Sequence, residues 1–132
     1  MTDGKIIKLP ESELEIMQAI WALNEEGEPG VSAGLIMKRF PDLQRLKLTT
    51  VLTLITRLQT KGYIKTEKIG RSNCYTPIIS SEEYRKFASG DFVEKVYMND
   101  KIGLISALVS DDSLTAEELS EIRALIEKNE KK

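Results

Sequence analysis

The chain has 132 residues, a formal net charge of −2, and hydrophobic and charged fractions of 41% and 30%, which suit one globular domain or two very small ones. It contains no histidine and one cysteine, so it lacks the commonest general base and cannot build a thiolate-rich metal site within one chain. It also has no phosphate-binding loop, dinucleotide-binding glycine pattern or nucleophile elbow. We therefore expect a protein that is not an enzyme and that uses no cofactor and no metal.

The apolar residues and the single cysteine also indicate the cellular location of the protein. The longest apolar runs are only a few residues, too short to span a bilayer, and the N-terminus has no apolar signal segment. A single cysteine fits a reducing compartment. We expect a cytoplasmic protein with no membrane partner.

The charge is distributed unevenly along the chain. Residues 1–30 carry a net charge of −5, residues 31–77 a net charge of +7, and residues 78–132 a net charge of −4. A basic middle between acidic ends indicates a polyanionic partner for the middle alone.

Three helices are predicted in the first half of the chain. Apolar residues recur at helical spacing over residues 11–25, 33–40 and 48–61. Ser32 is a typical N-cap for the second of these helices, and Gly62 is a typical stop for the third.

The third predicted helix has two unlike faces. At about 100° per residue, Leu48, Val51, Leu52, Ile55 and Leu58 gather on one side, which we expect to be buried. The opposite side carries hydrogen-bonding and basic side chains, namely Thr49, Thr50, Thr53, Thr56, Arg57 and Thr60.

A β-hairpin is predicted directly after the third helix. Residues 63–68 (YIKTEK) and 73–78 (NCYTPI) are rich in β-branched and aromatic residues spaced by two. Gly70–Arg71 supplies the turn between them.

The last third of the chain predicts three more helices. They cover residues 81–98 and 101–109, and a final stretch to residue 130 that Thr115 and Glu118 cap. Their apolar stripes are too small to bury themselves, so they either meet a symmetric partner or pack back onto the first domain of a monomer. The candidate dimerisation residues are Leu104, Ile105, Leu108, Val109, Leu119, Ile122, Leu125 and Ile126.

Three short helices followed by a hairpin form a winged helix-turn-helix, in which the third helix enters the major groove of DNA. We expect a mainly α fold, with a winged-helix DNA-binding domain in residues 1–79 and a helical dimerisation domain in residues 80–132. Threonine offers a hydroxyl for base edges or phosphates and a methyl for thymine. The candidate DNA-binding residues are Ser32, Lys47, Thr49, Thr50, Thr53, Thr56, Arg57, Lys61 and Arg71.

Two functions are consistent with these sequence features. The leading hypothesis is a homodimeric, sequence-specific repressor that binds double-stranded operator DNA. The alternative is a winged-helix module that binds another protein and has no specific DNA site. Reversing the charge of Lys61 and Arg57 separates the two, because only DNA binding depends on these cations.

The sequence resembles the BlaI/MecI/CopY family, the penicillinase-repressor type of bacterial regulator. The resemblance rests on SELEIMQAIW near the start, TTVLTLITRLQTKGYI in the middle, GRSNCYTPIISSEEYRKF after it and LTAEELSEIRALIE near the end. It implies a homodimeric repressor that binds a palindromic operator. Such repressors often control a β-lactam resistance operon, which can include a signalling protease, or the gene of a copper exporter.

The chain departs from both branches of that family. Ala107–Leu108 aligns where the β-lactam branch has an Asn–Phe cleavage pair, and the tail has no cysteine of the kind that the copper branch uses. Lys47–Leu48 also replaces the frequent Ser/Thr–Pro start of the recognition helix. The operator sequence, the regulated genes and the inducing signal therefore do not follow from the resemblance.

Overall fold

The computed structural model describes residues 6–110 and 112–131. The chain divides after Ala88 into two compact units, here termed the N-terminal unit and the C-terminal unit. In the described part of the chain, every helix is too short or too polar to cross a membrane.

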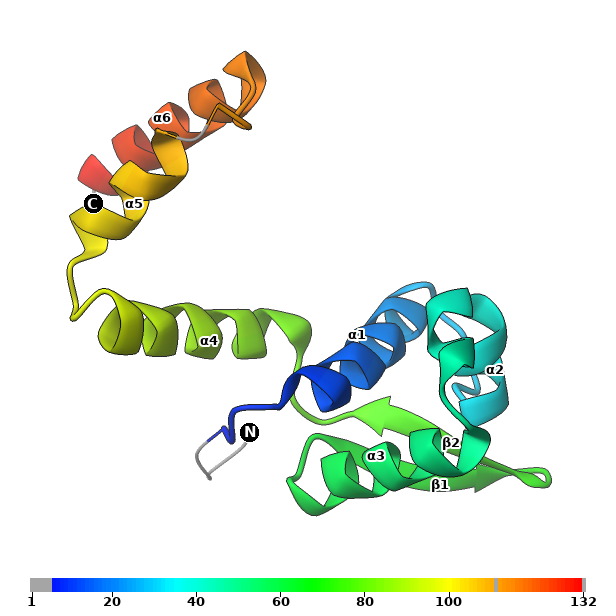
Figure 1. Cartoon of the computed structure of the whole chain (residues 1–132). Helices are drawn as coiled ribbons and strands as arrows, with labels where there is room; N and C mark the ends of the chain where they lie inside the picture. The colour runs from blue at the N-terminus through cyan, green and yellow to red at the C-terminus, as the bar shows by residue number, and fades with distance from the viewer. Residues whose placement is uncertain (1–5, 111, 132) are drawn as a thin grey trace. The chain divides into compact units, whose positions relative to one another are not determined.

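The N-terminal unit is a winged helix-turn-helix (Figure 1), which confirms the predicted fold class. Its elements follow in the order α1 (Glu11–Glu25), α2 (Ala33–Arg39), a short 3₁₀ helix η1 (Pro41–Arg45), α3 (Leu48–Thr60), β1 (Ile64–Ile69), β2 (Ser72–Pro77) and the first turns of α4 (Ser81–Val96).

Local interactions explain where these elements begin and end. The Ser32 hydroxyl accepts a hydrogen bond from the backbone N–H of Leu35 at 3.2 Å and caps α2. Gly62 follows α3 with φ at +82°, a conformation that glycine adopts without steric cost. Ser80 and Glu83 exchange two hydrogen bonds of 3.0 Å and form the capping box that starts α4.

The wing is a two-stranded antiparallel hairpin. The register pairs Ile64 with Pro77 at its base and Ile69 with Ser72 next to the turn. The N–H of Tyr75 also donates to the carbonyl of Val31 at 2.8 Å. This bond ties the hairpin to the chain segment that enters α2.

Aromatic side chains join the two ends of the N-terminal unit. The indole N–H of Trp21 donates to the carbonyl of Ile79 at 2.8 Å, and the Tyr84 hydroxyl accepts from the N–H of Leu9 at 3.1 Å. The Tyr84 ring lies 5.9 Å from the rings of both Trp21 and Tyr63. The first turns of α4 therefore complete the core of the winged domain, beyond the boundary expected at residue 79.

The buried side of α3 differs from the expected one. Val51, Ile55 and Leu58 are buried as predicted, but Leu54 is buried too, while Leu48 and Leu52 are 49% and 39% exposed. The prediction that Leu48 and Leu52 belong to the core was wrong. Residues 51, 54, 55 and 58 follow the spacing of a single helical stripe, and that stripe faces α1 and the hairpin.

The C-terminal unit contains the remaining turns of α4, α5 (Lys101–Val109) and α6 (Ala116–Glu130). α4 ends at Val96, two residues before the predicted end, because Met98 and Asn99 take positive φ values of 52° and 67°. Asp100 caps α5 through the N–H of Gly103 at 2.9 Å. The predicted Thr115–Glu118 capping box opens α6. None of the described residues of this unit is buried.

Candidate nucleic-acid interface

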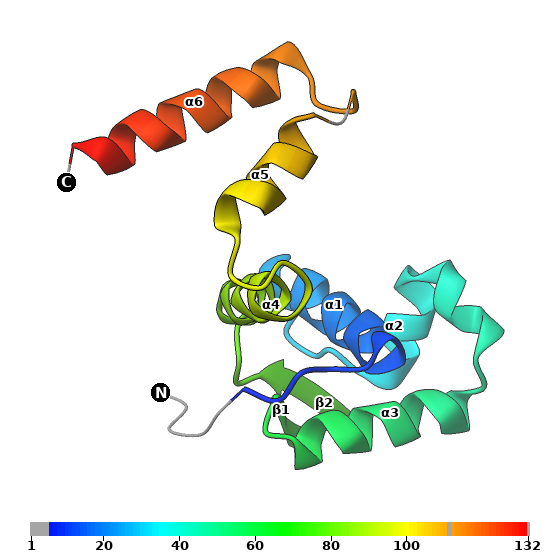
Figure 2. The same ribbon diagram turned by 60° about the vertical axis from the view of Figure 1, so that its left-hand side comes forward.

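Helix α3 presents its threonines to solvent. Figure 2 shows α3 along the lower edge of the N-terminal unit, with α1 and α2 above it. The exposed threonines are Thr49, Thr50, Thr53, Thr56 and Thr60. α3 contains no acidic residue, so its outward face presents hydroxyls, methyls and cations only.

The threonine hydroxyls fall into two groups. Those of Thr53 and Thr56 donate to backbone carbonyls four residues earlier, at 2.9 and 3.0 Å. Their oxygens are left as acceptors for amino groups of adenine or cytosine, and their methyls can meet thymine. Thr49 and Thr50 lie in the first turn, where no helical carbonyl precedes them, and within the described residues their hydroxyls make no such bond. These two can still donate to phosphate oxygens.

Cations stand at both ends of the threonine face, and another lies on the wing. Lys47 is the N-cap residue of α3, and Arg57 lies in its last turn; both are exposed. Exposed Arg71 follows Gly70 at the tip of the wing. In the described part of the chain none of these three forms an ion pair. Together with the free N–H groups at the start of α3, they create a surface that attracts phosphate.

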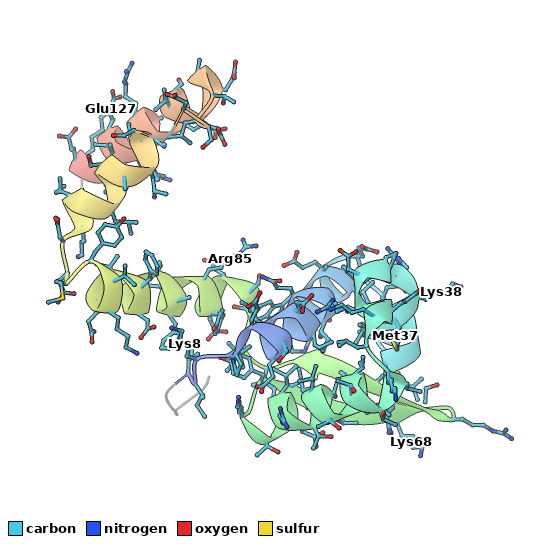
Figure 3. The ribbon with its side chains drawn as sticks, viewed as in Figure 1. Lys8, Met37, Lys38, Lys68, Arg85 and Glu127 are labelled. Carbon is cyan, nitrogen blue, oxygen red and sulfur yellow. The ribbon has the colours of Figure 1, made fainter. Side chains whose placement is uncertain are left out.

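Two further cations extend the basic surface: Lys38, which was not predicted from the sequence, and Lys68, which is expected to attract phosphate without sequence specificity. Figure 3 places Lys38 on α2 and Lys68 on the hairpin, and both side chains are exposed. Lys38 was missed in the sequence, although a basic pair before Pro41 is the kind of signal that could have indicated it.

Two of the predicted DNA-binding residues, Ser32 and Lys61, also form interactions that stabilise the fold. The hydroxyl of half-buried Ser32 is already engaged as the cap of α2. The ammonium of Lys61 forms an ion pair with Glu13, a carboxylate that is only 3% exposed. Arg39 and Arg45, also in the basic region, pair with Glu26 and Glu15 at 2.6 and 2.5 Å. These cations are therefore partly neutralised within the domain.

The end of α3 is anchored next to this ion pair. The Tyr63 hydroxyl donates to the carbonyl of Ile7. Burial raises the pKa of Tyr63 well above its usual value of 10.0, so the phenol keeps its proton and remains a donor. The two contacts fix the C-terminal end of α3 to α1 and to the segment before it.

A second candidate surface lies in the C-terminal unit. Helices α5 and α6 line a shallow, apolar groove of about 550 Å³. Six of the eight predicted dimerisation residues line it, namely Ile105, Leu108, Val109, Ile122, Leu125 and Ile126. Of the other two, Leu104 is half-buried and Leu119 is 39% exposed outside the groove. Ala107–Leu108 lies in α5, with both side chains exposed.

Two regulatory proteins are similar in sequence to this chain over nearly its whole length. It is 28% identical over 130 residues to the penicillinase repressor of Bacillus licheniformis, covering 97% of this chain and 98% of that protein. It is 27% identical over 126 residues to the methicillin resistance regulatory protein MecI of Mammaliicoccus sciuri, covering 96% and 98%. The DNA-binding domain of the repressor BlaI in solution is 28% identical, with a TM-score of 0.49 over 61% of this chain and 93% of that one.

The family comparison extends over both units. The penicillinase repressor family matches residues 9–128, from the segment before α1 to the last turn of α6. The chain belongs to the penicillinase repressor (BlaI/MecI) family of DNA-binding transcriptional repressors, whose members are not enzymes.

Proposed function

We propose that the protein represses transcription by binding a palindromic operator as a homodimer, with α3 of each protomer in the major groove. The observation that carries the proposal is the outward face of α3, where exposed threonines lie between exposed cations on a helix without acids. A major groove about 12 Å wide admits such a helix.

The residues of this surface take different roles in the proposal. Thr53 and Thr56 read base edges through their acceptor oxygens and methyls, because their hydroxyl protons are engaged within the helix. Lys47, Arg57 and Arg71 bind phosphates and set the register on the duplex. Thr49 and Thr50 can serve either purpose, since no bond within the described part of the chain engages their hydroxyl protons.

The apolar groove supports a homodimer. A two-fold axis places the same groove of each protomer against its copy, and burial of the exposed side chains of α5 and α6 supplies the driving force. Two recognition helices in such a dimer reach half-sites one helical turn apart, roughly 34 Å.

The names of the relatives support a resistance operon as the target. A penicillinase repressor and a methicillin resistance regulator are similar to this chain over nearly its full length. A protease that relieves repression at the position inferred from the resemblance would cut between Ala107 and Leu108, a dipeptide unlike Asn–Phe.

A gel-shift titration tests the proposal. The full-length protein is titrated against a duplex from upstream of its own gene and against a scrambled duplex of equal composition, at 50 and 200 mM salt, concentrations over which phosphate contacts weaken steeply. We expect tighter binding to the upstream duplex and a steep loss at the higher salt. Equal affinity for both duplexes contradicts sequence-specific repression.

Thr53→Ala adds a test of the reading face. We expect it to weaken operator binding by about 1 kcal/mol per half-site, the value of a typical hydrogen bond. Thr60→Ala is the matched control, because Thr60 makes the same bond to the carbonyl four residues earlier, at 3.0 Å, but lies at the far end of the helix. Equal affinities of the two variants remove Thr53 from the reading face.

A further inference from the structure

Two leucines on α3 do not belong to its core. Leu48 and Leu52 are 49% and 39% exposed, whereas each buried residue of the helix is at most 5% exposed. The α3 stripe that packs against α1 and the hairpin is complete without them. Single exposed apolar residues are common on protein surfaces, but apolar residues that adjoin one another beside a charged, acid-free face mark an interaction surface.

The helical spacing places both leucines beside the threonine face. Leu52 lies three residues after Thr49 and four before Thr56, and Leu48 lies four residues before Leu52. Residues three and four apart on a helix are surface neighbours. An apolar strip therefore runs along the threonines, beginning in the first turn of α3, the part of a recognition helix that contacts base edges.

The charges around the strip favour a duplex as its partner. Lys47 directly precedes Leu48, Arg57 follows in the last turn, and α3 has no acid. A second copy of the chain on this face would bring like charges together, whereas DNA neutralises them. The 5-methyl group of thymine is the apolar feature that base edges display in the major groove.

We propose that Leu48 and Leu52 are specificity-determining residues that contact thymine methyl groups within each half-site. The proposal rests on the proposed function and names part of the sequence that α3 reads. Leucine has no donor or acceptor, so these positions select thymine by apolar contact and not by hydrogen bonds. Such contact stabilises the complex by removing the methyl group and both leucines from water.

The experiment starts from selection and then removes single methyl groups. The full-length protein first selects duplexes from a pool of random 30-base-pair sequences. Each thymine of the selected duplex is then replaced, one at a time, by deoxyuridine, which pairs identically but lacks the methyl group. We expect one or two replacements per half-site to weaken binding about fourfold each, the equivalent of one buried methylene.

Variants assign the methyl contacts to the leucines. In Leu52→Ala or Leu48→Ala, we expect the deoxyuridine effect to disappear at the thymine that the residue contacts and to persist at the other. Ile78→Ala is the matched control, since Ile78 is 48% exposed and lies outside α3; it should keep every effect. Circular dichroism of each variant verifies that the fold is unchanged.

The outcomes separate the two proposals. Selection that enriches no sequence contradicts the proposed function itself. An enriched sequence whose thymines all tolerate deoxyuridine, or an effect that persists unchanged in both leucine variants, overturns only the role of the leucines. A change in the oligomeric state of Leu52→Ala in sedimentation also overturns it, because the strip would then contact a second copy of the chain.

Discussion

At the scale of single residues, the ion pair between Glu13 and Lys61 links the core to the end of α3. Glu13 is the one charged residue that is buried in the described part of the chain, and it comes from α1. Lys61 is the C-cap residue of α3, where a cation also meets the negative end of the helix dipole. The pair therefore fixes the end of α3 at the same time as it satisfies a buried carboxylate.

Removing Lys61 should destabilise the domain. Lys61→Ala leaves the Glu13 carboxylate buried without its partner, and we expect a loss of about 1–3 kcal/mol in the free energy of unfolding. Urea denaturation measures this loss. Lys65→Ala is the control, since Lys65 is exposed on β1. The double variant Glu13→Gln, Lys61→Met removes both charges and should recover most of the stability. Equal midpoints for Lys61→Ala and the control would contradict a structural role for the pair.

The carboxylate of Glu83, in the capping box of α4, makes the stability of the fold depend on pH. This carboxylate accepts from the backbone N–H of Ser80, and the Ser80 hydroxyl adds to the effect; together they lower the pKa of Glu83 below its usual 4.5. A lowered folded-state pKa contributes stability that is present above pH 4.5 and is lost as the pH falls through the folded-state value. We expect Glu83→Gln to be less stable than the wild type at neutral pH and to approach it at acidic pH.

Urea unfolding of wild type and Glu83→Gln, at pH 7 and at successively lower pH, checks this expectation. Glu82→Gln supplies the background, because Glu82 is exposed in the same turn. A stability difference between Glu83→Gln and wild type that stays constant across the pH range would show that the charge of Glu83 plays no part in the cap.

At the scale of elements, local signals predicted the boundaries well. Ser32, Gly62 and the Gly70 turn stand where a helix begins, a helix ends and a hairpin reverses. Each of these signals depends on backbone conformation or capping, which neighbouring residues determine. These local sequence signals were therefore sufficient to predict the order and type of the elements that build the winged domain.

The orientation of α3 could not be predicted in the same way. Residues 48, 51, 52 and 55 and residues 51, 54, 55 and 58 both form stripes with helical spacing. The helix itself permits either, and contacts with α1 and the hairpin bury the second. For the same reason, sequence reasoning placed Leu48 and Leu52 in the core and overlooked them as part of the surface. It also had no signal for the partner of Lys61, 48 residues away along the chain.

A pair of substitutions measures which stripe is the core. Leu54→Ala should lower the free energy of unfolding by about 2–5 kcal/mol, because it opens a cavity in a packed interior. Leu52→Ala, the same chemical change two positions away, should cost about 0.5 kcal/mol. Urea denaturation of both variants compares them directly. A larger loss for Leu52→Ala would reverse the assignment of the two faces.

At the scale of the whole molecule, the two units differ in how they are stabilised. The N-terminal unit has a core of aliphatic and aromatic side chains drawn from α1, α2, α3, the hairpin and the start of α4. The C-terminal unit has no buried residue among those described, yet α5 and α6 expose leucine, isoleucine and valine. A helical unit of this size needs further apolar contacts to be stable, and a second protomer supplies them in the proposed dimer.

Leu108→Asp tests whether the groove between α5 and α6 holds that protomer. Leu108 is 58% exposed and lines the groove, so a carboxylate there would be buried without a partner in the dimer. We expect a cost of about 3 kcal/mol, which raises the dissociation constant of the dimer about 100-fold. Sedimentation equilibrium measures this constant. Operator affinity should fall as the dimer dissociates, because each monomer then reaches only one half-site.

Ser120→Asp is the control, because it adds the same charge to an exposed position of α6 outside the groove. It should change neither the dissociation constant of the dimer nor the operator affinity. If Leu108→Asp remains as dimeric as this control and binds DNA equally well, the protomers associate through another surface.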